Sequence, residues 1–307
     1  IQKSSIAKDL TKMSSKSAIR LVVPQDAQSS LFKWVAVLTG SKNALKGVGF
    51  FVGSALLTLF GFVNALWIMA GGLFLILFTS IMLPEDMGKI KQKVNFKELF
   101  SKSQEINILS AARFFLFGSR DVWFVVGLPV FLEGTLGWSF YEVGGFMACW
   151  VIGYGIIQSL APTLMQKLGS GEPPQSKTIQ FWTFTLTGVP AAIALALQLG
   201  LPANLVIVGG LMLFGIVFAF NSAVHSYLVL AFTDDDKVAL NVGFYYMANS
   251  GGRLAGTVLS GLVYQISGLV GCLWVSMLFV LAAALVSLKL PDPQPSKAIA
   301  WKAGSGK

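Results

Sequence analysis

Three stretches of this chain are long enough to cross a lipid bilayer and contain no Lys, Arg, Asp or Glu: residues 64–83, 178–199 and 268–288. A helix needs about 20 apolar residues to cross about 30 Å of hydrocarbon. Over all 307 residues only 12% are charged, whereas a soluble domain has about 25%. The sequence therefore predicts an all-α protein that crosses the membrane several times.

Further apolar stretches predict about eight spans in all. The expected spans are 29–61, 64–83, 106–132, 140–166, 178–199, 204–232, 239–266 and 268–288. Basic residues occur in alternate connections: the loops at 84–105, 166–178 and 233–238 contain Lys, while the turns between them contain neither Lys nor Arg. Cytoplasmic loops are richer in Lys and Arg. We therefore expect the loop 84–105 and the C-terminus to lie in the cytoplasm.

The polar stretch 84–105 is the longest interruption of the apolar pattern and predicts a boundary between two halves. Many secondary transporters consist of two six-helix halves. We therefore expect 1–83 to be the remainder of an N-terminal half (the end of helix four, then helices five and six). Residues 106–290 would be the C-terminal half (helices seven to twelve), and 291–307 a cytoplasmic tail. On this prediction about four helices precede Ile1, and the fold is an N-terminally truncated major facilitator superfamily fold. The three uncharged spans are then helices six, nine and twelve, which lie outermost in that fold.

The remaining spans contain charged side chains, which is unusual inside a membrane. A charge near the centre of a bilayer helix costs about 2.5–3.5 kcal/mol on insertion scales and usually faces a partner or a water-filled cavity. Cations outnumber anions here: the spans contain Lys42, Lys46, Arg113, Arg120 and Arg253, with Asp121 the central carboxylate. The surplus predicts a cavity that binds an anion, because guanidinium groups match phosphate and carboxylate oxygens in bidentate fashion.

Helical spacing selects the residues of this candidate site. Residues three, four or seven apart share a helix face, which places Arg113 with Arg120, Asn249 with Arg253 and Tyr245, and Asn221 with His225. The predicted substrate-binding residues are Lys46, Arg113, Arg120, Arg253, Asn221, His225, Tyr245 and Asn249. Two alternatives stay open: Arg120 pairs with Asp121 and only locks the bundle, and Arg113, nearer the cytoplasmic end, reaches the membrane surface.

Export against a gradient needs an energy source, and proton antiport is the hypothesis that the sequence favours. The candidate proton carriers are Asp121 and His225, while Glu133 and Glu142 flank the predicted outer turn 134–141 and are expected to be solvated. The glycine pairs Gly49/Gly53 and Gly252/Gly256 are small-xxx-small patterns and predict close helix packing.

Other classes of function find little support in the chain. It contains no GxxxxGK[ST] loop and no HExxH motif, and with one His it offers no nucleophile and base pair. We therefore expect no enzyme activity, no cofactor and no metal. The net charge of +9 comes from loops and tail, so nucleic acid is not an expected partner. Cys149 and Cys272 are isolated in apolar runs and are expected to be small buried residues. A non-transporting membrane scaffold remains an alternative.

Four segments resemble the ArsJ-type organoarsenical efflux permeases, which belong to the major facilitator superfamily. They are AKDLTKMSSKSAIRLVVP (7–24), LFKWVAVLTGSKNALKGVGFF (31–51), LSAARFFLFGSRDVWFVVGLPVF (109–131) and DDDKVALNVGFYYMANSGGRLAGTVLSGLVYQ (234–265). The resemblance implies export of 1-arseno-3-phosphoglycerate across the bacterial inner membrane and resistance to arsenate. It also implies a functional partner, the glyceraldehyde-3-phosphate dehydrogenase that makes this compound. A permease for another phosphorylated or carboxylated metabolite is the alternative within the same superfamily.

Overall fold

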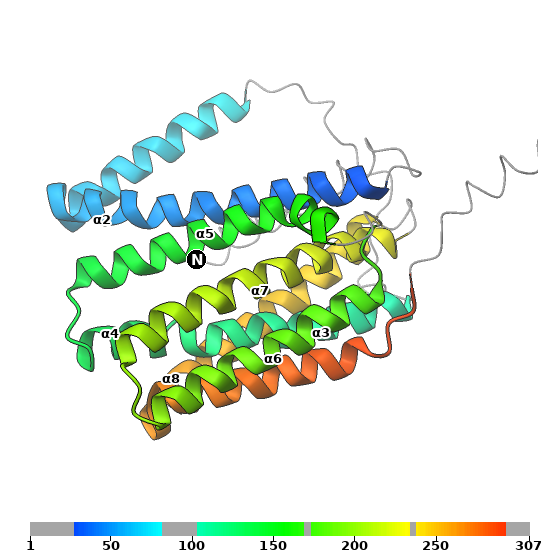
Figure 1. The fold of residues 1–307 in the computed structure, drawn as a ribbon. Coiled ribbons are helices and arrows are strands. Elements are labelled where there is room, and N and C mark those ends of the chain that lie inside the picture. Colours follow the sequence, from blue (N-terminus) through cyan, green and yellow to red (C-terminus); the bar gives the residue numbers. More distant parts are fainter. Residues whose placement is uncertain (1–27, 82–102, 169–172, 234–237, 293–307) are drawn as a thin grey trace, which may run out of the picture.

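The computed structural model describes residues 28–81, 103–168, 173–233 and 238–292, which form an all-helical bundle (Figure 1). The helices are α2 (Gln28–Ile81), α3 (Gln104–Phe124), α4 (Gly127–Gly134), α5 (Phe140–Leu168), α6 (Ser176–Gln198), α7 (Ala203–Ala231) and α8 (Val238–Ser287). Six helical segments within these ranges are long and apolar enough to cross a membrane. The predicted all-α class is confirmed, while the predicted loop 84–105 and tail 291–307 lie almost wholly outside the described residues.

Two of the helices reverse direction at a single glycine. Gly61 in α2 has φ 72° and ψ 172°, and Gly268 in α8 has φ 60° and ψ −161°. Positive φ values cost glycine little because it lacks a Cβ. The reversals fall at the predicted turns, so α2 and α8 each contain two of the expected spans. Figure 1 shows α2 folding back at its left end.

The predicted span 106–132 is not one continuous helix, because it breaks between α3 and α4. At the break the Ser260 hydroxyl of α8 accepts hydrogen bonds from the backbone N–H groups of Val126 (3.2 Å) and Gly127 (3.1 Å). These donors begin a new helix and have no partner within it. The α8 side chain therefore compensates for the interruption.

Basic residues gather at one end of the bundle. Helices α3, α6 and α8 begin at the end where α5 and α7 finish (Figure 1). Lys167 lies in the last turn of α5, Lys177 near the start of α6 and Lys289 just after α8. Glu133 and Glu142 lie at the opposite end, near the connection of α4 to α5. This distribution agrees with the charge pattern of the loops; the assignment of the basic end to the cytoplasm stays a prediction.

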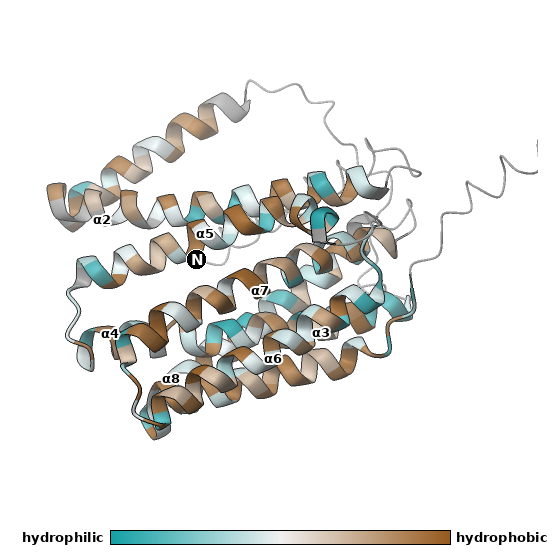
Figure 2. Ribbon diagram, viewed as in Figure 1, coloured by the Kyte–Doolittle hydropathy of each residue, from teal (hydrophilic) through white to brown (hydrophobic). Residues whose placement is uncertain are grey.

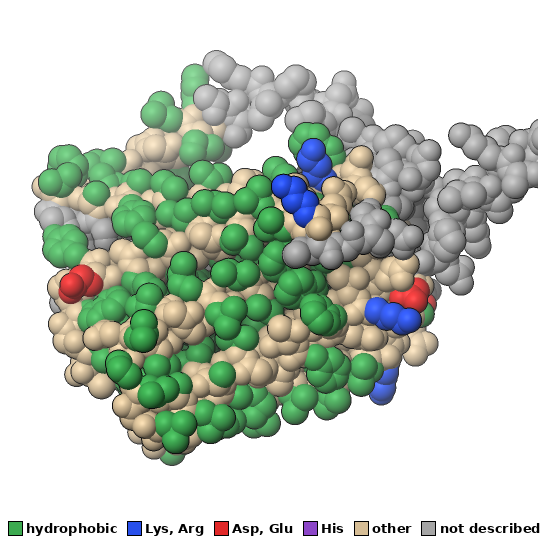
Figure 3. Space-filling view, in the orientation of Figure 1, with side chains coloured by type: hydrophobic (Ala, Val, Ile, Leu, Met, Phe, Trp, Pro, Cys, Tyr) green, Lys and Arg blue, Asp and Glu red, His purple; other side chains and the backbone are tan. Residues whose placement is uncertain are grey.

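The outside of the bundle is apolar, as the bilayer requires. Figure 2 shows hydrophobic residues along the length of each helix, and in Figure 3 the few charged side chains on the visible face lie toward the ends of the bundle. Large hydrophobic side chains on the second part of α2 are exposed, among them Phe62, Trp67 and Phe74. Apolar surface of this kind is suited to acyl chains or to further transmembrane helices.

Helices α3 and α8 form the most extensive contact in the bundle. A Cβ atom on Gly252 would collide with the carbonyl oxygen of Phe114, and one on Gly256 with that of Gly118. The predicted packing role of Gly252 and Gly256 is thus confirmed. The same expectation for Gly49 and Gly53 is wrong within the described residues, because no atom lies within 4 Å of a Cβ on either.

Replacing Gly252 with Val should destabilise the bundle, because the larger side chain forces α3 and α8 apart. Overpacking of this kind costs about 1–3 kcal/mol. Thermal unfolding of the purified protein in detergent measures the effect. Gly261→Val on the same helix is the matched control, since the space around Gly261 is open. Equal unfolding temperatures for the two variants would contradict the proposed contact.

Candidate functional site

The close packing of α3 and α8 brings the predicted cations together. Arg113, Arg120 and Asp121 lie on α3, while Asn249 and Arg253 lie one turn apart on α8. The glycine at position 252 lets the two backbones approach, so that side chains beside it reach across the contact. The site is therefore built on two rigid helices, and its geometry is set by their crossing.

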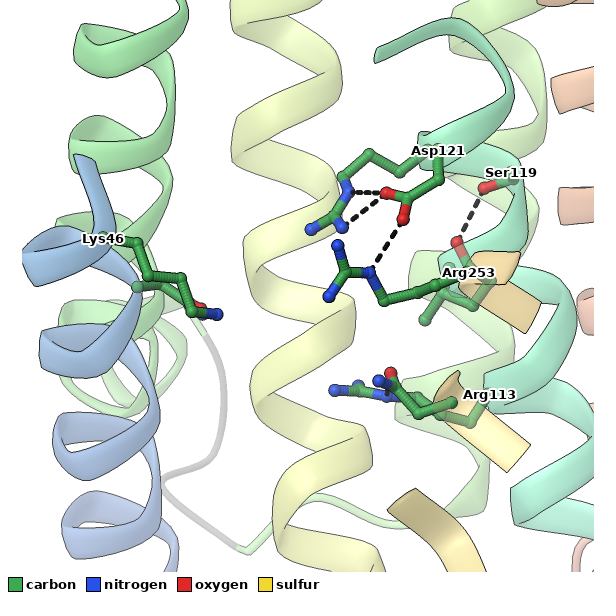
Figure 4. Close-up of polar contacts among 9 residues, drawn as sticks. Lys46, Arg113, Ser119, Asp121 and Arg253 are labelled. Atoms are coloured by element: carbon green, nitrogen blue, oxygen red, sulfur yellow. Dashed lines mark hydrogen bonds and ion pairs between the residues drawn. The ribbon is translucent and has the colours of Figure 1, made fainter. Parts of the chain in front are cut away.

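Asp121 lies at the centre of an ion cluster (Figure 4). Its Oδ1 accepts hydrogen bonds from Nε and Nη2 of Arg120, the first at 2.7 Å, and its Oδ2 accepts one from Nε of Arg253 at 2.7 Å. The Asp121 side chain is fully buried, whereas the side chains of Arg120 and Arg253 are 14% and 46% exposed. One carboxylate thus serves two guanidinium groups. The pairing of Arg120 with Asp121 is confirmed, and the idea that this pair only locks the bundle stays a hypothesis.

Arg113 is buried without a carboxylate partner in the described part of the chain. Its Nε donates to Oδ1 of Asn249 at 3.0 Å, and its Nη1 donates to the Ser222 hydroxyl at 3.2 Å. Its guanidinium also lies over the rings of Phe117 (3.7 Å) and Tyr245 (5.1 Å). The side chain is only 3% exposed, so the alternative that Arg113 reaches the membrane surface is wrong. A buried cation with only neutral partners is costly, which marks this residue as a candidate for binding.

The Lys46 side chain, on α2, points toward the arginines of α3 and α8. In Figure 4 its side chain and the Arg253 guanidinium point toward one another from opposite sides of α7. Lys46 is exposed, and its Nζ donates to Oδ1 of Asn43 at 2.9 Å. Both Lys46 and Arg253 are accessible to solvent.

The other predicted hydrogen-bonding residues are buried but do not all face the arginines. Asn249 and Tyr245 contact Arg113, as described above. The amide of Asn221 instead donates to the Thr183 hydroxyl of α6 at 2.9 Å. His225 is fully buried on α7. The arrangement thus joins Tyr245 and Asn249 to the cation cluster, while Asn221 bonds toward α6.

Three neutral residues extend the site, and sequence reasoning missed them. Nδ2 of Asn43 donates to Oε1 of Gln158 at 2.7 Å, and Nε2 of Gln158 donates to the Ser222 hydroxyl at 3.1 Å. A search for charged residues overlooks such amides and hydroxyls. The available signals were the amide of Gln158 in the middle of an apolar span, and the spacing of Asn43 from Lys46 on one face of α2.

The arrangement of the helices is similar to that of a known transporter. A crystal structure of a bacterial homologue of the iron transporter ferroportin in an outward-facing state matches with a TM-score of 0.68. The match covers 93% of this chain and 70% of that one, at 17% sequence identity. No protein-family model and no curated protein sequence matches the chain. The chain therefore shares its fold with this transporter homologue, in agreement with the predicted major facilitator fold. The resemblance to organoarsenical permeases remains a hypothesis.

Neutralising the central carboxylate should destabilise the protein, because removing one partner of a buried ion pair costs about 3–5 kcal/mol. We expect Asp121→Asn to lower the thermal unfolding temperature, and the added change Arg120→Gln to recover part of the loss. The recovery should be larger than with Arg253→Gln, since Arg253 is more exposed. Glu133→Gln, at an exposed carboxylate, is the control. Strictly additive effects of Asp121→Asn and Arg120→Gln would contradict the described pairing.

Proposed function

We propose that the protein is a secondary transporter that exports an anionic solute by alternating access. One observation carries the proposal: three guanidinium groups (Arg113, Arg120 and Arg253) lie on the packed pair α3 and α8 with a single carboxylate between them. Buried charges in membrane helices are expensive and are found mainly where a solute or an ion passes. An anion would supply the negative charge that the cluster lacks.

The exposure of the cations indicates how such a solute would enter. Arg253 and Lys46 are accessible, Arg120 is mostly buried, and Arg113 is enclosed. Arg253 uses only Nε to bind Asp121, so its terminal nitrogens remain available to a second acceptor. A phosphate-like group suits this position, because its oxygens accept parallel N–H bonds from one guanidinium.

The substrate that we propose is 1-arseno-3-phosphoglycerate, exported across the bacterial inner membrane. It carries only negative charge, which suits a site that includes the cations Lys46, Arg120 and Arg253. The sequence resemblance to organoarsenical permeases supports this choice over other phosphorylated or carboxylated metabolites. On this proposal the glyceraldehyde-3-phosphate dehydrogenase is a functional partner because it supplies the substrate, and the outcome is resistance to arsenate.

Asp121 is the stronger of the two candidates for proton coupling. An arriving anion and the Asp121 carboxylate would compete for the donors of Arg253, so binding of the solute and the state of Asp121 would be linked. His225 is fully buried on α7, whereas Asp121 binds two guanidinium groups directly. We therefore propose Asp121 as the coupling residue; proton antiport stays a prediction.

Expression of the complete gene in an arsenic-sensitive host should raise arsenate tolerance only when the dehydrogenase is expressed as well. Arg253→Gln should weaken transport by about 10- to 100-fold, the value of a lost charge-assisted hydrogen bond of about 1.5–3 kcal/mol. Lys177→Gln, which removes an exposed cation at the end of the bundle, is the control. Tolerance that does not depend on the dehydrogenase would contradict the substrate. Unchanged transport by Arg253→Gln would favour a scaffold.

Transport into everted membrane vesicles tests the coupling residue. With the dehydrogenase, NAD, glyceraldehyde 3-phosphate and arsenate supplied outside, we expect vesicles to accumulate arsenic and an imposed pH gradient to change the rate. Asp121→Asn should abolish the response to the pH gradient, because the variant side chain carries no titrating carboxyl group. His225→Gln should keep the response. A pH response that survives Asp121→Asn and disappears in His225→Gln would assign the coupling to His225.

A further inference from the structure

Helix α2 contacts the rest of the described bundle mainly through α5 and α7. On the predicted two-half organisation, this contact is the interface between the halves. It is tight between Gly40 and Gly47: a Cβ on Gly40 would collide with Gly155 and Ser159, and one on Gly47 with Ile152. Figure 1 shows α2 and α5 diverging toward the end at which α2 reverses.

A chain of hydrogen bonds crosses the interface at this same level. It runs from Lys46 through Asn43 to Gln158 of α5, and from there to Ser222 of α7, which also accepts from Arg113. The hydrogen bond between the side chains of Asn43 and Gln158 joins α2 directly to α5. The chain thus joins an accessible cation of one half to an enclosed cation of the other.

The charges at the two ends fix the direction of every bond in the chain. The Lys46 ammonium can only donate, so it holds the oxygen of Asn43 toward itself and the amide nitrogen toward Gln158. Arg113 can also only donate, and Ser222 accepts from both sides. Gln158 is the one member that accepts from α2 and donates to α7. Reversing its amide would break both of these bonds.

We propose that Gln158 is a positioning residue that holds α2 against α5 while the site is empty and releases it when an anion engages Lys46. This inference rests on the proposed function for the identity of the anion. An anion that draws the ammonium away from Asn43 removes the charge that orients the Asn43 amide, and the bond to Gln158 weakens. A ligand shifts a conformational equilibrium only by binding the two states differently, and Lys46 provides that difference here.

Thiol labelling without substrate tests the contact. The probe is a membrane-impermeant maleimide, added to a variant that carries Val48→Cys together with Cys149→Ser and Cys272→Ser. Val48 is 46% exposed and follows the contact on α2. Gln158→Leu removes the hydrogen bonds that hold α2 against α5 in this arrangement. We therefore expect the cysteine at position 48 to be labelled from the outer side about three- to tenfold more slowly, the ratio that corresponds to the loss of one or two neutral hydrogen bonds. Gln180→Leu is the matched control, because the Gln180 amide binds a backbone carbonyl of α8.

Gln158→Glu gives the opposite expectation and covers the case in which Gln158→Leu fails to fold. A carboxylate between Asn43 and the two cations keeps the contact closed, so labelling should be as fast as in the parent or faster. Equal labelling rates in the parent and Gln158→Leu would overturn the proposal, as would slower labelling in Gln158→Glu. Absence of transport by the parent would remove the proposed function and leave this comparison intact.

Discussion

The ion pair between Arg120 and Asp121, in which two guanidinium nitrogens share Oδ1 and which Arg253 extends through Oδ2, is the interaction on which the site depends. It joins α3 to α8 at mid-height in the bundle, at the place where Gly252 and Gly256 bring the two backbones together. Packing and electrostatics support one another there. Without the close approach Arg253 would not reach Asp121, and without Asp121 two guanidinium groups would repel one another in a poorly solvated interior.

The cluster leaves a surplus of positive charge among the described residues, and the proposed binding role rests on this surplus. In a structural lock each buried charge is balanced by its partner. Here Asp121 has both oxygens engaged, while Arg113 depends on the neutral oxygens of Asn249 and Ser222. The proposal of an anion-binding site rests on this incomplete balance of charge.

Much of the architecture could be predicted from hydropathy, and the reasons are physical. A bilayer forces backbone groups to bond within helices, so the apolar runs predict the spans, and the reversals at Gly61 and Gly268 occur at predicted turns. The break between α3 and α4 could not be predicted, because it depends on a hydroxyl of α8 far along the chain. Helical periodicity placed the arginines on shared faces. It could not reveal that Asn221 bonds to α6, or that Gln158 joins α2 to α7.

The single-glycine reversal at Gly268 has a mechanical consequence. A one-residue turn gives the helices before and after it little freedom to move separately, so the last apolar segment must follow the segment that carries Arg253. That last segment has large exposed side chains such as Leu278 and Leu285. Any tilt of the segment that carries Arg253 is thus transmitted to the surrounding lipid, and the hydrocarbon thickness of the bilayer enters the energy of that movement.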